Sequence, residues 1–246
     1  GISILSAAAA GAGLASIFAM LVLRLEANPV ATGLALTLFG LGLAALFGAQ
    51  YVGRAAPQIA VWSIPVLSEI PVVGRALFAH DPLVYLSVLM VILVWWFLYR
   101  SRAGLVLRAV GENHDAAHAL GFSVLGIRFL AILSGGALAG IGGAYLTLVQ
   151  TPMFVEGMTA GRGWIALALV VFAAWRPVRV MLGAYLFGSV SILQLHSQAF
   201  GIAIPAQWLS MLPYVVTIIA LVVISARGVQ GTSAPASLAK TFRVSR

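Results

Sequence analysis

The sequence predicts an all-α protein, a polytopic transmembrane helical bundle with about seven spans and a cytoplasmic C-terminus. The first observation behind this prediction is the composition, because 62% of the 246 residues are hydrophobic and 8% are charged. Soluble chains carry roughly 25% charged residues, so this chain has too few polar groups to cover a surface that faces water. The other observations are a series of long apolar segments and a one-sided distribution of the basic residues between them.

The composition also excludes several classes of protein. The net charge of +8 comes from 14 basic and 6 acidic residues scattered between apolar segments, whereas a nucleic-acid-binding domain gathers its basic residues in a patch. The chain contains no cysteine, which excludes a disulfide framework, a thiolate metal site and a cysteine nucleophile.

The spans follow from the length that a helix needs to cross a bilayer. A core of about 30 Å requires roughly 20 apolar residues at 1.5 Å each. Seven segments pass this test: Ile4–Leu23, Pro29–Gly48, Leu83–Tyr99, Val124–Gln150, Gly163–Trp175, Val178–His196 and Trp208–Ser225. The first lacks the basic region and cleavage signature of a signal peptide, so we expect a helix of the mature protein. The fourth is long, and we expect it to tilt or to break at its glycines.

The orientation follows from the basic residues, which accumulate in cytoplasmic loops. Seven spans place ten of these residues on one side and three on the other, with Arg128 near the inner end of its helix. The ten are Arg24, Arg100, Arg102, Arg108, Arg176, Arg179, Arg227, Lys240, Arg243 and Arg246, and the three are Arg54, Arg75 and Arg162. We therefore expect a transmembrane domain at residues 1–226 and a loosely ordered cytoplasmic tail at residues 227–246.

The loop between the second and third spans, residues 49–82, lies on the outer side in this topology. Pro57, Pro65 and Pro71 prevent a continuous helix there, although the segment is rich in apolar residues. Two interpretations remain open. The loop is either an interfacial or re-entrant platform on which another protein docks, or a hydrophobic connection.

The inner loop, residues 100–123, is the longest polar stretch between spans. Gly111 and Gly121 bracket a short helix that Asn113 is placed to cap, and apolar residues alternate with charges along it. A short amphipathic helix on the cytoplasmic face is suited to a groove on a soluble partner. A solvated connector is the alternative interpretation.

Two blocks of sequence carry a resemblance to a known family. The first comprises Gly111-Glu112-Asn113, Asp115-Ala116-Ala117 and Gly121, followed by Ser134 to Gly140, and the second runs from Met158 to Pro177. Together they resemble the permease subunit of ABC importers, in the branch that handles simple sugars, nucleosides and, more distantly, branched-chain amino acids. Such permeases usually have a longer N-terminal part, and they commonly have proline where this chain has His114. We therefore expect the N-terminus to be incomplete.

The resemblance implies the many-helix fold of ABC importer permeases and a coupling role for the inner loop. It implies that the loop inserts into a separate ATP-binding subunit through Arg108, Gly111, Glu112, Asn113, Asp115, Ala116, Ala117, Leu120 and Gly121. Its charged members would pair with charges on that subunit, while Ala116, Ala117 and Leu120 would fill its groove. The implied partners are two ATP-binding cassette subunits, a second permease subunit, the same or homologous, and an extracytoplasmic solute-binding protein. The implied location is the plasma membrane, the inner membrane of a bacterium.

Small residues on the fourth span predict close helix packing. Gly136 and Gly140 stand four residues apart, and Gly135 and Gly143 lie on an adjacent register. Such spacing lets helix backbones approach closely in lipid. The pattern fits either static packing or a helix that slides during transport.

Polar residues near the outer face or within the spans are candidates for a solute path or its outer mouth. They are Gln150, Glu156, Thr159, Arg162 and Gln194. Polar groups at membrane depth are costly and are therefore functional suspects. A structural ion pair between Glu156 and Arg162, and structural hydrogen bonds between helices, are the alternatives.

The chain is not expected to be an enzyme or to hold a cofactor or a metal. A phosphate-binding loop ends in Gly-Lys-Ser/Thr, whereas the single lysine, Lys240, follows Ala239. Two other functions remain open. One is an ATP-independent secondary transporter, and the other is an intramembrane metalloenzyme at His114 and His118, whose spacing imitates a zinc-binding helix without an evident third ligand.

Overall fold

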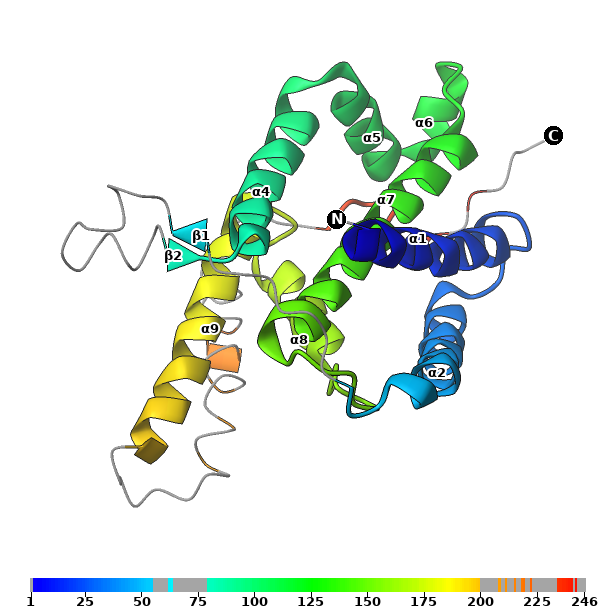
Figure 1. The fold of residues 1–246 in the computed structure, drawn as a ribbon. Coiled ribbons are helices and arrows are strands. Elements are labelled where there is room, and N and C mark those ends of the chain that lie inside the picture. Colours follow the sequence, from blue (N-terminus) through cyan, green and yellow to red (C-terminus); the bar gives the residue numbers. More distant parts are fainter. Residues whose placement is uncertain are drawn as a thin grey trace. The chain divides into compact units, whose positions relative to one another are not determined.

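The computed structural model describes residues 2–54, 62–63, 79–199, 208, 211, 215, 218–219, 222, 234–240 and 242. The regular secondary structure of this part of the chain is helical apart from two strands of two residues each. Figure 1 shows how these elements follow one another along the chain. Its elements are α1 (Ile2–Leu23), α2 (Pro29–Gly48), a 3-10 turn (Ala49–Tyr51), β1 (Trp62–Ser63), β2 (Ala79–His80), α4 (Pro82–Arg100), α5 (Arg102–Glu112), α6 (His114–Ala119), α7 (Val124–Tyr145), a π turn (Leu146–Gln150), α8 (Arg162–Phe172) and α9 (Pro177–Ala199). The predicted all-α fold class is confirmed.

Four helices among the described residues are long and apolar enough to cross a membrane. They are Ile2–Leu23, Pro29–Tyr51, Pro82–Arg100 and Val124–Gln150, and they match the first four predicted spans. Two shorter apolar helices, Arg162–Val171 and Pro177–Leu193, lie at the fifth and sixth predicted spans. The seventh, Trp208–Ser225, and most of the outer loop at residues 49–82 lie outside the described residues. The chain is a multi-pass integral membrane protein.

The surfaces of the long helices are apolar, as a lipid environment requires. Leu38 and Leu46 on α2 are 72% and 71% exposed, and Leu5 on α1 is equally open. Exposing a helix that is apolar on every face to water costs much free energy, so these side chains face lipid.

Local capping explains where two of the spans begin. The Asn28 side chain accepts hydrogen bonds from the N–H groups of Val30 (2.9 Å) and Ala31 (3.1 Å) at the start of α2. The buried Asp81 side chain does the same for α4, accepting from Leu83 at 3.0 Å. In each case proline follows the cap, where its missing N–H costs nothing.

The chain divides into two units. The first comprises residues 1–90, 98–160 and 237–246, and within it α1 packs along α7 while β1 pairs antiparallel with β2 through Trp62 and His80. The second comprises residues 91–97 and 161–236, and within it α8 and α9 form a helical hairpin. The turn of this hairpin places Ala174 and Trp175 at positive φ, 51° and 57°.

The glycine-rich span α7 does not break at its glycines. The helix is continuous from Val124 to Tyr145, and only then widens into the π turn Leu146–Gln150. Of the two alternatives expected for this long span, a tilt or a break at its glycines, the break is not observed, for a physical reason. Glycine weakens an isolated helix, but here two of the glycines lie against a neighbouring helix that supports the backbone.

Candidate functional site

The inner loop folds into two helices, α5 and α6, that precede α7. The Ser101 side chain caps α5 by accepting a hydrogen bond from the Gly104 N–H at 2.9 Å. One face of α5 is buried through Gly104 and Val110, while Leu105 and Arg108 are exposed. The Arg108 guanidinium lies 5.0 Å from the centre of the Tyr99 ring, a cation–π distance that holds this cation beside the end of α4.

Asn113 makes the break between the two helices. Its backbone is extended, with φ −145° and ψ 101°, and its N–H still closes the last turn of α5 by donating to the Ala109 carbonyl at 2.9 Å. Its side-chain oxygen accepts from the Ala116 N–H at 3.0 Å and so begins α6. Gly121 ends α6 with φ +87°, a conformation that favours glycine. The short helix between Gly111 and Gly121 is present, with Asn113 as its cap.

The loop has an exposed face and a buried face. The Asp115 side chain is 77% exposed and Leu120 is 77% exposed, and Glu112 and Ala116 are exposed as well. We expected Ala117 to be available to fill a groove on the ATP-binding subunit, and the structure differs. Ala117 is 3% exposed and packs with Val110 and Val124 inside the chain, so it does not belong to the exposed face.

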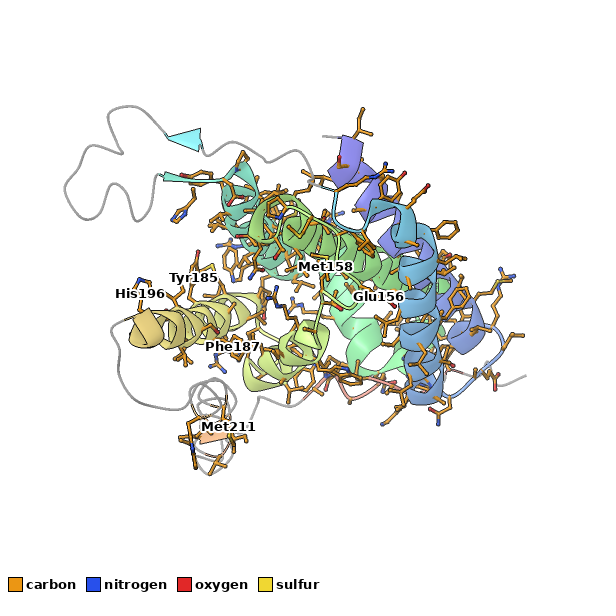
Figure 2. The ribbon with its side chains drawn as sticks, turned by 60° about the horizontal axis from the view of Figure 1, so that its bottom comes forward. Glu156, Met158, Tyr185, Phe187, His196 and Met211 are labelled. Carbon is orange, nitrogen blue, oxygen red and sulfur yellow. The ribbon has the colours of Figure 1, made fainter. Side chains whose placement is uncertain are left out.

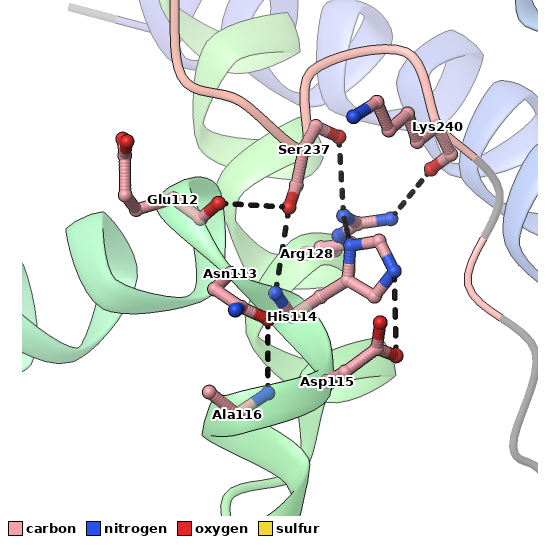
Figure 3. Close-up of polar contacts among 8 residues, drawn as sticks. All are labelled: Glu112, Asn113, His114, Asp115, Ala116, Arg128, Ser237 and Lys240. Atoms are coloured by element: carbon pink, nitrogen blue, oxygen red, sulfur yellow. Dashed lines mark hydrogen bonds and ion pairs between the residues drawn. The ribbon is translucent and has the colours of Figure 1, made fainter.

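The C-terminal residues that the structure describes lie against this loop, as Figure 3 shows. The Ser237 N–H donates to the Gly111 carbonyl at 2.9 Å, and the Phe242 side chain is 8% exposed in the cluster around Val110. We expected a loosely ordered tail, and this expectation was wrong for these residues. The sequence signal was a single phenylalanine in a polar stretch, which does not reveal a contact with residues more than a hundred positions earlier.

The imidazoles of His114 and His118 both contact the ring of Phe242. The centre of the Phe242 ring lies 5.2 Å from that of the His114 ring and 5.4 Å from that of the His118 ring, both in edge-on geometry. Among the described residues, no three histidine or acidic side chains are grouped as metal ligands would be.

The glycines of α7 meet α1 unequally. A Cβ on Gly136 would lie 2.6 Å from the Gly11 carbonyl oxygen, and a Cβ on Gly140 would overlap the carbonyl of Ala7. Real Cβ atoms do not come so close to backbone atoms, so these two positions require glycine while the helices keep this separation. At Gly135 and Gly143 a Cβ would meet nothing within 4 Å.

A groove of about 780 Å³ lies between α1, α2 and α7. Ten of its fifteen lining residues are alanine or glycine, and larger apolar side chains come from Leu14, Leu148 and Phe154, while Ser3 and Thr147 add hydroxyls. The Thr147 hydroxyl donates within its own helix to the Ala144 carbonyl at 3.2 Å. The groove therefore offers small apolar surface and little polar selectivity.

The candidate path residues fall in both units. Gln150 ends the π turn, and Glu156 and Thr159 are exposed on the segment that follows it; Figure 2 labels Glu156 and Met158 on this segment. Arg162 begins α8, and Gln194 lies in α9, where its side chain is outside the described residues. A role in a solute path stays a prediction for each of them.

Comparison with known proteins bears on this arrangement. Residues 1–221 match the model of a family described as branched-chain amino acid transport system / permease component. A protein of Haloferax volcanii named "Putative glucose ABC transporter permease protein" is 44% identical over 200 residues, which cover 80% of this chain and 61% of that protein. A nucleoside ABC transporter permease protein of Lactococcus lactis subsp. cremoris is 38% identical over 227 residues, 89% of this chain and 72% of that protein.

A third relative and the solved structures complete the comparison. The guanosine ABC transporter permease protein of Bacillus subtilis is 30% identical over 230 residues, 89% of this chain and 72% of that protein. The chain thus spans about three fifths of the length of the first relative and under three quarters of the other two. No solved structure matches the chain significantly.

Proposed function

Because the chain belongs to the branched-chain amino acid transport system / permease component family, we propose that it is the membrane-spanning permease subunit of a binding-protein-dependent ABC importer. It performs no covalent chemistry, and a separate subunit hydrolyses ATP. The solute is a small polar molecule, a nucleoside or a simple sugar, a proposal supported by the names of the relatives. The partners are two ATP-binding subunits inside, a second permease subunit, and a solute-binding protein outside.

The observation that carries the proposal is the exposed face of α5 and α6. Leu120 holds a large apolar side chain 77% exposed, outside the long apolar helices, and the carboxylates of Glu112 and Asp115 on the same two helices and their connection are also exposed. Covering such a side chain in a protein groove contributes about 1.5–3 kcal/mol. The flanking carboxylates would add specificity and faster association more than affinity.

The connection from α6 to α7 supports coupling through this face. ATP hydrolysis can drive a membrane helix only through a contact whose free energy differs between two states. Residues 120–123 join α6 to α7, and Val124, the first residue of α7, is 1% exposed against the loop. A displacement of α6 therefore acts directly on the start of a membrane span.

The experiment is a pull-down of the tagged chain in mild detergent from its native membrane, with mass spectrometry and an ATPase assay of the recovered material. We expect a nucleotide-binding subunit to be recovered, and we expect Asp115→Asn with Leu120→Ala to reduce its recovery about tenfold or more. Leu25→Ala is the matched control, because Leu25 is a 69% exposed leucine in another loop of the same predicted side.

Two results would contradict the proposal. One is recovery of the ATPase that is equal in the double variant and the control. The other is a chain that purifies alone and drives nucleoside or glucose uptake into vesicles without ATP, which would favour a secondary transporter.

A further inference from the structure

Residues 237–240 and 242, here called the tail segment, pack on α5, α6 and the start of α7 (Figure 3). Phe242 is 8% exposed and shares one apolar cluster with Val110, Ala117 and Val124. The buried face of the loop is therefore completed by a side chain from the far end of the sequence. Burial of a phenylalanine is among the largest contributions that one residue makes to docking.

Ser237 satisfies backbone groups that the break at Asn113 leaves without partners. The last carbonyls of α5 have no donor within their own helix, and the first N–H groups of α6 have no acceptor within theirs. The Ser237 N–H donates to the Gly111 carbonyl at 2.9 Å, and its hydroxyl donates to the Glu112 carbonyl at 3.3 Å. The same hydroxyl accepts from the His114 N–H at 3.4 Å. One buried serine thus joins the end of α5 to the start of α6.

Arg128 links the tail segment to the exposed face. Its guanidinium donates to the carbonyls of Lys240 (2.9 Å) and Ser237 (3.3 Å) and, at 3.2 Å, to Nδ1 of His114. Since Nδ1 accepts, this arrangement assigns the imidazole proton to Nε2, which lies 3.5 Å from the Asp115 carboxylate. Hydrogen bonds to a charged guanidinium are stronger than neutral ones. A series of polar contacts therefore runs from the docked tail segment through Arg128 and His114 to Asp115.

We propose that the tail segment is a clasp that fixes the angle between α5 and α6, with Ser237 and Phe242 as positioning residues. The clasp keeps the exposed side chains of Glu112, Asp115 and Leu120 in fixed positions relative to one another, ready for the nucleotide-binding subunit. This role rests on the proposed function, while the docking itself does not. Without the clasp the loop still forms, but its exposed side chains lose a fixed orientation. A smaller fraction of the ATP hydrolysis events on the partner subunit then moves α7.

Docking is tested on the full chain alone, by cysteine labelling. The natural chain has no cysteine, so a single Ala117→Cys introduces the only thiol, at a 3% exposed site beneath Phe242. We expect a hydrophilic maleimide to label it roughly 10- to 100-fold faster when Phe242→Ala is added, the range implied by losing one buried phenylalanine. Removal of residues 237–246 should act at least as strongly. Phe242→Tyr should restore slow labelling.

Two controls separate undocking from unfolding. Lys240→Ala should label as slowly as the parent, because Lys240 takes part through its backbone carbonyl and N–H, which alanine keeps. Ala119→Cys, exposed on the same helix, should label rapidly in every background. Equal labelling of Ala117→Cys with and without Phe242→Ala would overturn the docking.

The positioning role is tested in the reconstituted importer. We expect Phe242→Ala and Ser237→Ala to lower the solute transported per ATP hydrolysed severalfold, with the solute concentration for half-maximal rate unchanged, because the tail segment contacts the inner loop and the start of α7. Phe242→Tyr should rescue the ratio. An unchanged ratio in a variant that labels rapidly would overturn the positioning role. If the unmodified chain recovers no ATPase, the proposed function fails, and the labelling result still decides the docking.

Discussion

The contact between α1 and α7 gives a sharp prediction for Gly140→Ala. A Cβ at Gly140 would overlap the Ala7 carbonyl oxygen and lie 2.8 Å from its carbon, whereas a Cβ at Gly142 would meet nothing within 4 Å. Both substitutions gain the same helix preference, about 1 kcal/mol for alanine over glycine. Only Gly140→Ala must push two backbones apart, and such overpacking costs about 1–3 kcal/mol. The difference between the variants isolates the contact, because the shared gain cancels.

The assay compares tagged variants in detergent after heating, by the fraction that stays monodisperse on size exclusion. The midpoint is the temperature at which half of the monodisperse fraction is lost. We expect the midpoint of Gly142→Ala to equal or exceed that of the natural chain, and the midpoint of Gly140→Ala to be clearly lower. Gly140→Leu should lower the yield further, because a larger side chain needs a wider separation. Gly140→Ala and Gly142→Ala with the same midpoint would refute the argument that this pair of helices is held by backbone contact.

Three further predictions concern local structure. Asp81→Ala removes the cap of α4 and should destabilise the protein by about 0.5–2 kcal/mol, while Asp81→Asn, which still caps, should stay close to the natural midpoint in the same heating assay. Gly121→Ala forces a side chain into φ +87° and should cost about 1–2 kcal/mol, seen as faster hydrogen exchange of the Leu120 and Gly121 amides; unchanged exchange would contradict it. Ala174→Gly relieves the strain of φ 51° in the turn of the α8–α9 hairpin and should raise the free energy of unfolding by about 1 kcal/mol, seen as a higher midpoint temperature. A lowered midpoint temperature would show that the turn is unstrained.

Much of the fold could be predicted because lipid imposes one simple requirement, a continuous apolar helix of sufficient length. The first three predicted spans agree with α1, α2 and α4 to within two residues at each end. The cap at Asn113 could also be predicted, because capping depends on the residue itself and its next three neighbours.

The faces of the inner loop could not be predicted in the same way. Ala116 and Ala117 are adjacent and chemically identical, yet one is exposed and the other is 3% exposed. Ala117 packs with Val110, Val124 and Phe242, and the last of these lies more than 120 residues away, so no local pattern encodes the whole contact. Similarly, four glycines of α7 look alike in sequence, and only the position of α1 distinguishes Gly136 and Gly140 from Gly135 and Gly143.

The close approach of α1 and α7 also has a mechanical consequence. Most helix interfaces are cushioned by side chains, which absorb small displacements by changing rotamer. At Gly136 and Gly140 the nearest atoms of α1 are backbone atoms of Gly11 and Ala7 and the methyl group of Ala15, so the two main chains are in close contact. Because few side chains separate α1 from α7, we expect a displacement that begins at Val124 to move the two helices together.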